Sequence, residues 1–168
     1  MEEFEKAGCK IREMTPKDNS AMAALIRDNL KKNSLDIPGT AYFDSALDNL
    51  CAFYSNNEKR GYYVLTDEND CVLGGVGLAE FTPFEDCAEL QKLYLADSVK
   101  GRGLGYQLLR FIEEKMIEKG YQAAYLETHA NLKTAIHIYE KSGYQKIERP
   151  KGVVHETMDH FYYKTLTR

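Results

Sequence analysis

The sequence lacks three features that would place it in a special class of protein. Its net charge is −4, so it has no overall excess of the basic residues with which proteins bind nucleic acids. No apolar run approaches the roughly 18 residues of a membrane-spanning helix, and the acidic start MEEFEKAG has no apolar signal-peptide core. The four cysteines (Cys9, Cys51, Cys71 and Cys87) are scattered, without a CxxC pair or a histidine at metal-ligand spacing. We therefore expect a cytoplasmic protein with reduced cysteines and no metal, whose partners include neither nucleic acid nor membrane.

What remains is the composition of an ordinary globular domain. The chain has 168 residues, of which 43% are hydrophobic and 29% charged, and it contains no repeat or linker. We expect one domain over residues 1–168. Strand-like and helix-like periodicities alternate along it, which predicts an α/β fold. Strands are expected at 9–14, 61–81 (a hairpin turning at 68–70), 87–96, 121–128, 144–148 and 160–166, and helices at 16–30, 45–55, 104–116 and 131–143.

Three glycines within five positions, Gly101, Gly103 and Gly105, separate a predicted strand from a predicted helix. The first N–H groups of a helix have no internal partner and the helix dipole is positive there, so a helix start can bind an anion. Glycine permits positive φ and a close approach of the backbone. With Lys100 and Arg102 beside them, the glycines predict a cradle for a phosphate or pyrophosphate. A glycine-rich turn without a ligand is the alternative. The spacing matches neither a Walker loop nor a dinucleotide fingerprint, so ATP and NAD are poor candidates.

A second segment, ETHANLKTAIHIYEKSGYQ, follows the next predicted strand. The two segments together resemble the signatures of the GNAT superfamily of acyltransferases, which move an acetyl group from acetyl-CoA to an amine. The first signature, Gln/Arg-x-x-Gly-x-Gly/Ala, matches residues 100–105, with Lys100 in place of the usual Gln or Arg. The second matches Asn131, Ala135 and the run 139–144. In element order the resemblance extends over residues 10–166.

The resemblance implies a fold and an acyl donor. The fold is a mixed, mostly antiparallel sheet of about six to seven strands flanked by helices, with two splayed strands forming the acyl-CoA cleft. The donor is acetyl-CoA, with its pyrophosphate on the amides of residues 100–106 and its pantetheine arm along the preceding strand. Asn131 holds that arm or caps the helix, and Ala135 leaves room for it. The cofactor-binding residues expected from the resemblance are Leu93, Tyr94, Leu95, Lys100, Gly101, Arg102, Gly103, Leu104, Gly105, Tyr106, Asn131, Ala135 and Tyr139.

The acceptor amine sets an acid–base problem. A primary alkyl amine has a pKa of about 10.4, and only its neutral form attacks a thioester. Glu89 is the expected base, because on an extended strand it shares a face with Gln91, Leu93 and Leu95. Ordered water, His129 or His155 are the alternatives, whereas His137 is expected to face away from Tyr139. Tyr139 matches the family's tyrosine, which implies that it gives a proton to the departing CoA sulfur; packing in the core is the alternative.

Selectivity for the acceptor should come from outside the two signatures. The resemblance implies that residues 33–60, rich in aromatics, and the loop 148–159 wall the acceptor site. Their acidic side chains could attract a cationic amine; they are Asp36, Asp44, Glu156 and Asp159. The acceptor itself is open between a polyamine, an aminoglycoside, an amino acid and a protein amine, and the chain between monomer and homodimer. We expect direct transfer of acetyl to a primary amine in a ternary complex; the alternative is a non-catalytic acyl-CoA sensor.

Overall fold

The computed structural model describes residues 2–154 and 157–167. The helices are α1 (Glu2–Lys6), α2 (Asn19–Lys32), α3 (Leu50–Ser55), α4 (Leu104–Glu118) and α5 (Lys133–Lys141). The strands are β1 (Lys10–Glu13), β2 (Gly61–Thr66), β3 (Val72–Glu80), β4 (Cys87–Leu95), β5 (Ala123–Thr128), β6 (Gln145–Ile147) and β7 (His160–Thr165). Short 3-10 turns are η1 (Pro16–Asp18), η2 (Ala41–Phe43), η3 (Ser45–Asn49) and η4 (Asp97–Val99).

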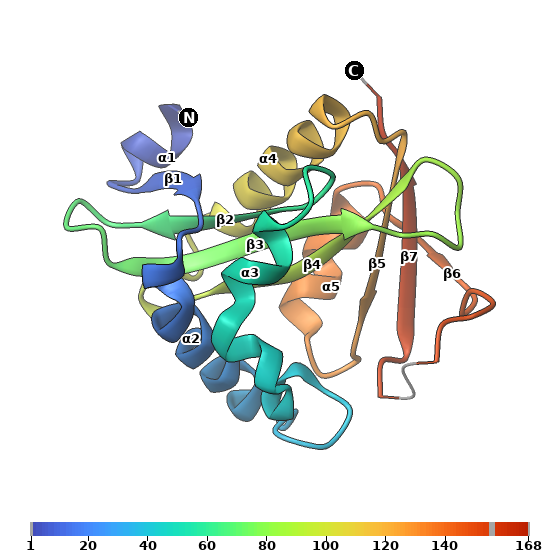
Figure 1. Cartoon of the computed structure of the whole chain (residues 1–168), viewed down its shortest axis with the longest axis horizontal. Helices are drawn as coiled ribbons and strands as arrows, with labels where there is room; N and C mark the ends of the chain where they lie inside the picture. The colour runs from blue at the N-terminus through green and yellow to red at the C-terminus, as the bar shows by residue number, and fades with distance from the viewer. Residues whose placement is uncertain (1, 155–156, 168) are drawn as a thin grey trace.

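The strands form one seven-stranded sheet in the order β1-β2-β3-β4-β5-β7-β6 (Figure 1). Every neighbouring pair is antiparallel except β4 and β5, which are parallel. Within residues 2–154 and 157–167, the only crossover between parallel neighbours is therefore the one that carries the glycine loop and α4. The mixed, mostly antiparallel sheet implied by the sequence resemblance is confirmed.

Helices cover both faces of this sheet. On one face α4 and α5 bury a core with β2, β3, β4 and β5, in which Leu108, Leu109 and Ile112 are fully buried. On the other face α2, η3 and α3 bury a second core around Met22, Ile26 and Leu30 (Figure 1). The apolar spacing along α2 and α4 places these residues on one side of each helix, which is why both helices dock on the sheet.

The start of α2 is fixed by a charged cluster that the sequence partly reveals. Thr15, Pro16 and Asp18 form a helix-entry turn, in which the Asp18 carboxylate accepts the Thr15 N–H at 2.8 Å. The guanidinium group of Arg12, on β1, donates two hydrogen bonds to the same carboxylate, at 2.8 and 2.9 Å. Hydrogen bonds from Arg12 outweigh burial and lower the pKa of Asp18. This pair ties the edge strand to α2.

The expected hairpin and the other expected helices and strands are present, with boundaries moved by a few residues. One element was not predicted: the short helix α1, which packs Phe4 edge-on against Phe111 of α4, with 6.3 Å between ring centroids. In the described chain, the helices fall short of the combined length and apolarity that a membrane-spanning segment needs.

Candidate active site

The sheet opens between its two parallel strands. β4 and β5 pair only at their first residues, the last pair being Glu89 with Tyr125. Beyond Glu89, β4 continues to Leu95 paired with β3 alone, and β5 continues to Thr128 paired with β7 alone. The backbone of β4 from residue 90 onward therefore has no strand partner on the β5 side within the described chain. This is the splay that the sequence resemblance implied.

A β-bulge interrupts β4 just beyond the point of separation. Gly77 pairs with Gln91 and Gly75 with Tyr94, so β4 has one residue more than β3 in this interval. Lys92 absorbs it with φ +50°, a left-handed conformation that is uncommon for residues other than glycine. An extra residue reverses the alternation of side chains along a strand.

The bulge corrects the expectation that Glu89, Gln91, Leu93 and Leu95 share one face. Leu90, Leu93 and Leu95 all contact the core beneath α4, although Leu90 and Leu93 are an odd number of residues apart. Gln91 lies on the opposite face, where its side-chain oxygen accepts a hydrogen bond from Tyr54 at 2.6 Å. Tyr94 also packs on that face. No local feature of the sequence indicates the bulge, because QKLYL is typical of a regular strand.

The glycines of β3 make room for a tyrosine that holds the bulge. Tyr62 on β2 crosses β3, and its hydroxyl donates to the carbonyl oxygen of Lys92 at 2.7 Å. A Cβ on Gly75 or Gly77 would lie 2.6 Å from the Tyr62 ring. Only glycine at these two positions permits the ring to lie against the strand.

The glycine loop leads directly into α4. Gly101 and Gly103 both have φ +75°, and a Cβ at either would meet no atom within 4 Å. Gly103 is the N-cap of α4 and has no side chain with which to cap it. The first N–H groups of α4 thus face an open, exposed turn, as an anion-binding helix start requires.

The two cations of this loop have protein partners. The ammonium group of Lys100 donates to the Asn29 side-chain oxygen at 2.9 Å and pairs with Asp97 at 2.8 Å. The guanidinium group of Arg102 donates to the carbonyl oxygen of Ala7 at 2.7 Å. Hydrogen bonds from Lys100 and then Lys32 lower the pKa of Asp97 to about 2. Both cations remain exposed at the loop, which they also fasten to the rest of the fold.

Asn29 is a residue of this region that sequence reasoning missed. Its amide donates to the carbonyl oxygen of Leu95 at 3.1 Å, while its oxygen accepts from Lys100. The Leu95 carbonyl, at the end of the splayed strand, therefore already has a partner. The sequence does contain a signal for Asn29: it is a polar residue at a position on the apolar face of α2, where the structure buries it.

Gly105 packs α4 closely against α5. A Cβ there would lie 2.8 Å from the terminal methyl carbon of Ile138. The residue is buried, unlike Gly101 and Gly103. The third glycine of the motif thus lets two helices approach, and one of them carries Tyr139.

Tyr139 projects from α5 into the core under the splay. Its side chain is 5% exposed, and within the described chain its hydroxyl has no hydrogen-bond partner. Burial, and then the nearby Tyr94 phenol, raise its pKa. The side chain of Tyr139 stays protonated at neutral pH and has a hydroxyl proton to donate.

Glu89 lies where the two strands part, among aromatic side chains. Its negative charge contributes to raised pKa values of Tyr54 and Tyr125, although burial is the larger cause at both. Tyr125 faces it across the last strand pair and stacks on Phe81, with 3.8 Å between ring centroids. The carboxylate therefore sits on the face opposite Tyr139 and its α5 helix.

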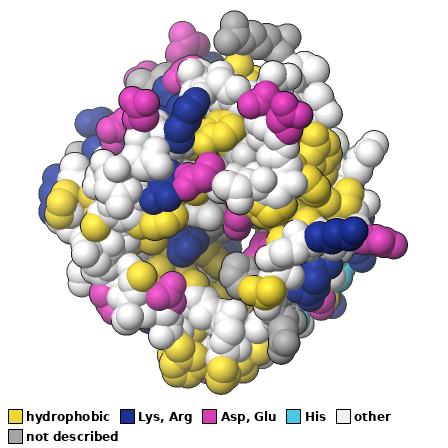
Figure 2. Space-filling view, turned by 45° about the vertical axis from the view of Figure 1, so that its right-hand side comes forward, with side chains coloured by type: hydrophobic (Ala, Val, Ile, Leu, Met, Phe, Trp, Pro, Cys, Tyr) yellow, Lys and Arg dark blue, Asp and Glu magenta, His cyan; other side chains and the backbone are white. Residues whose placement is uncertain are grey.

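The two segments expected to wall the acceptor site meet in the structure. The Thr157 hydroxyl donates to the carbonyl oxygen of Pro38 at 3.3 Å. The large hydrophobic side chains that remain exposed in the described chain all belong to these segments: Ile37, Phe43, Phe53 and Val154. Figure 2 shows one face of the molecule with a hollow near its middle, and hydrophobic side chains and charged side chains of both signs lie around it. His155 and Glu156 lie outside the described residues.

A family model for the acetyltransferase (GNAT) family matches residues 22–144, which include both signatures. The chain belongs to the GNAT family. An uncharacterized N-acetyltransferase of Escherichia coli, YjgM, is 37% identical over 144 residues, covering 84% of this chain and 85% of that protein. An aminoalkylphosphonate N-acetyltransferase of Salmonella typhimurium is 28% identical over 141 residues, covering 82% and 86%. This GNAT protein is accordingly an enzyme of the acetyltransferase class.

Solved structures agree on the GNAT fold. A GNAT acetyltransferase of Staphylococcus aureus superposes with a TM-score of 0.81 at 20% identity, over 95% of this chain and 99% of that one. The PaiA N-acetyltransferase of Thermoplasma acidophilum, solved with coenzyme A, gives 0.73 at 19% identity, over 94% and 98%. At these identities the likeness establishes the fold.

Two expected roles in this GNAT chain need correction or restriction. Asn131 does not cap α5, because the N-cap is Leu132; its amide donates instead to the carbonyl oxygen of Asn33 at 2.9 Å. His129 accepts the Asn131 N–H on Nδ1 at 3.1 Å, and its Nε2 lies 3.9 Å from Asp159. Asp159 also accepts from Ala130 and contacts His160. His137 is exposed and points away from buried Tyr139, as expected.

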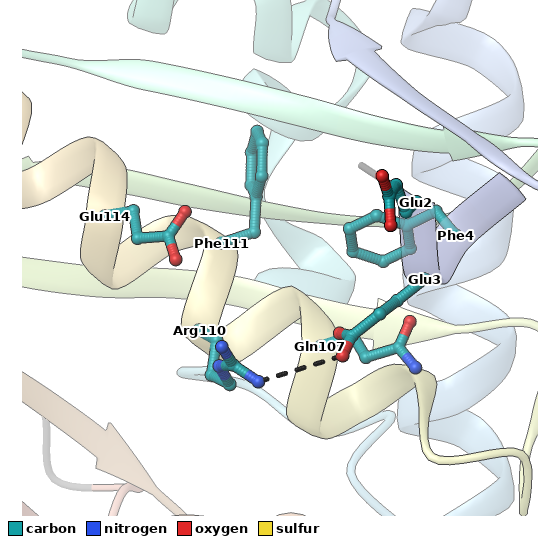
Figure 3. Close-up of a pocket in the computed structure, with 7 residues that line it drawn as sticks. All are labelled: Glu2, Glu3, Phe4, Gln107, Arg110, Phe111 and Glu114. Atoms are coloured by element: carbon teal, nitrogen blue, oxygen red, sulfur yellow. Dashed lines mark ion pairs between the residues drawn. The ribbon is translucent and has the colours of Figure 1, made fainter.

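A separate cavity of about 300 Å³ lies between α1 and α4, away from the splay (Figure 3). Arg110 approaches Glu3 across it, at 4.0 Å. None of the predicted site residues lines this cavity, whose walls are Glu2, Glu3, Phe4, Gln107, Arg110, Phe111 and Glu114. Over the described residues, no group of three histidine, cysteine or acidic side chains is placed to hold a metal ion.

Proposed function

We propose that this GNAT protein transfers an acetyl group from acetyl-CoA to a primary amine by direct attack in a ternary complex. The observation that carries the proposal is the position of the splay. β4 leaves β5 after Glu89, ends at Leu95, and the open glycine turn and the start of α4 follow within ten residues. One continuous stretch thus offers an unpaired strand edge and an anion-binding helix start.

Coenzyme A has the matching chemistry along its length. Its pyrophosphate suits the first amides of α4, where Gly101 and Gly103 leave the backbone open, with Lys100 and Arg102 adding positive charge. Its pantetheine amides suit the free edge of β4 at Leu93 and Tyr94, in the manner of an added strand. Ala135, on the first turn of α5, has only a methyl side chain and packs against the same core as Leu93.

The chain's own residues supply the proton transfers. At pH 7 deprotonating the amine costs about 4–5 kcal/mol, at 1.36 kcal/mol per pKa unit. Glu89 accepts that proton, directly or through water. As the new C–N bond forms and the thioester C–S bond breaks, Tyr139 gives its hydroxyl proton to the sulfur. The second proton that the amine nitrogen loses passes through water to the Tyr139 oxygen, which restores the hydroxyl. Acetyl-CoA supplies the activated acyl group; the protein orients it and moves the protons.

The alternative of an acyl-CoA sensor makes a different prediction from the same binding site. Supporting catalysis, Tyr139 is present with a hydroxyl that has no partner in the described chain. The test combines two measurements on the wild-type protein: thermal shifts with CoA, NAD and ATP at equal concentration, and thiol release from acetyl-CoA with a panel of amines. An enzyme gives a larger shift with CoA than with NAD or ATP and amine-dependent thiol release. CoA binding without turnover on any amine would favour the sensor, and equal shifts from all three nucleotides would contradict the CoA site.

A further inference from the structure

The bulge in β4 places Lys92 within electrostatic reach of Glu89 and of Asp44, which belongs to the segment expected to wall the acceptor site. Lys92 holds a left-handed backbone conformation that glycine adopts freely and lysine adopts only at an energetic cost. Such outliers persist where the surrounding structure fixes them, and they cluster at functional sites. Tyr62 fixes this one through the Lys92 carbonyl oxygen. The strained backbone at Lys92 therefore indicates that its side chain has a function.

The Lys92 side chain is partly withdrawn from solvent and has no partner within the described residues. The residue is half-buried, and within the described chain its side chain makes no hydrogen bond or ion pair. Burial lowers its pKa, opposed by the charges of Glu89 and Asp44. By contrast, half-buried Lys164 donates to Glu113 at 2.9 and 3.0 Å. A half-buried cation without such a partner is suited to an anion from outside the chain.

We propose that Lys92 binds an anionic group of the acceptor, so that the preferred acceptor is a small amine that also carries a carboxylate or a phosphonate. The inference rests on the proposed function and narrows it to a class of acceptor. Glu89 and Lys92 carry opposite charges three residues apart on one strand beside the splay. An acceptor with both groups matches this pair of charges, because its amine can approach Glu89 while its anion binds Lys92. A polyamine would instead be repelled by the charge of Lys92.

Matched acceptors test this with the whole chain. The probes differ in the group they carry besides the reacting amine: an anion in aminoethylphosphonate and β-alanine, no charged group in propylamine, and a second ammonium in putrescine. We expect kcat/KM for the better anionic amine to exceed that for propylamine by at least about tenfold, the effect of one charge-assisted contact. The ranking of phosphonate against carboxylate identifies which anion the site takes.

Variants at Lys92 separate recognition from structure. Lys92→Met should bring the ratio of anionic amine to propylamine within about threefold of one, while Lys92→Arg should keep the preference. Lys92→Gly should abolish the preference without lowering Tm, because glycine relieves the left-handed strain. Lys146→Met, at an exposed position on β6, is the matched control and should leave the ratio unchanged.

Three outcomes would overturn the inference. Propylamine or putrescine could be as good an acceptor as the anionic amines, or Lys92→Met could lower kcat/KM for all four by the same factor. In either case the acetyltransferase proposal stands and the role of Lys92 falls. No thiol release with any amine, together with no thermal shift from CoA, would overturn the proposed function and this inference with it.

Discussion

The hydroxyl of Tyr62 reaches across β3 to the carbonyl oxygen of Lys92, 2.7 Å away. This contact joins β2 to the bulge of β4 over a strand whose glycines leave space for the ring. The bulge sets which side chains of β4 face the core under α4 and which face the opposite core under α2 and α3. Tyr62 is therefore a positioning residue for the candidate site.

Tyr62→Phe keeps the ring and removes the donor. We expect it to lower the free energy of unfolding by about 1 kcal/mol, the net value of a hydrogen bond whose loss leaves a buried acceptor. kcat/KM should also fall, because the bulge loses the hydrogen bond that holds the Lys92 backbone in place. Tyr63→Phe is the control, since Tyr63 is the next residue on β2 and its hydroxyl makes no hydrogen bond within the described chain. Urea unfolding and steady-state kinetics measure both effects; equal changes in the two variants would contradict a special role for Tyr62.

Gly105→Ala tests whether the third glycine serves helix packing. Alanine gains about 1 kcal/mol of helix propensity over glycine, but its Cβ would lie 2.8 Å from the Ile138 Cδ1 atom. Ile138→Val removes that atom. We expect Gly105→Ala to stabilise the Ile138→Val protein more than the wild type, with a coupling of at least about 0.5 kcal/mol by urea unfolding. Additive effects would mean that α4 and α5 are not in close contact at this glycine.

Sequence reasoning was most successful where a local signal exists. Apolar periodicity predicted α2, α4 and α5, because it reflects a local requirement for one buried face on each helix. The splayed strands were implied by the resemblance of the two signatures to the GNAT superfamily. The bulge was not predictable, since Lys92 adopts φ +50° inside a sequence that reads as plain strand. A tertiary contact, the hydrogen bond from Tyr62, holds the bulge. The faces on which Gln91 and Leu93 lie follow from the bulge, so they were not predictable either.

Other misses have the same origin. α1 is too short to be stable alone and depends on Phe4 packing against Phe111. The sequence position of Asn131 suggested a helix cap. Its amide instead donates a hydrogen bond to the carbonyl oxygen of Asn33, which is 98 residues away in the sequence. Partners so distant in sequence leave no pattern within one chain.

The Arg12–Asp18 pair should make stability depend on acid pH. The pKa of Asp18 is lowered in the folded protein, so this pair's contribution is fully present above the unfolded-state value of about 3.9 and is lost as pH falls through the folded value. Asp18→Asn should cost about 2 kcal/mol near neutral pH, as for a charge-assisted contact, and the difference from wild type should shrink below about pH 4. Urea unfolding across pH measures it, with exposed Asp36→Asn as the control. A difference that is constant with pH would contradict the linkage.

Glu89→Gln should lower kcat/KM at neutral pH by at least about tenfold, the low end expected for a lost general base. The deficit should shrink as the pH approaches the amine pKa of about 10.4, because bulk solvent then supplies the neutral amine. Glu114→Gln on α4, remote from the splay, is the control. pH–rate profiles with a confirmed acceptor decide the question. A variant with wild-type rates at every pH would remove Glu89 from the mechanism and leave water or a histidine as the base.

Tyr139→Phe tests the proton donor to the departing thiolate. The ring is buried in the core under the splay and phenylalanine preserves that packing, so Tm and CoA affinity should change little. The loss should fall on kcat, because the donor matters most as negative charge develops on sulfur. General acid catalysis is typically worth about 10²–10⁴-fold, and since a thiolate is a good leaving group we expect the low end. Tyr163→Phe on β7 is the control, because its half-buried hydroxyl makes no hydrogen bond within the described chain. If Tyr139→Phe retains wild-type kcat while chemistry is rate-limiting, Tyr139 is a packing residue and the sulfur takes its proton from water.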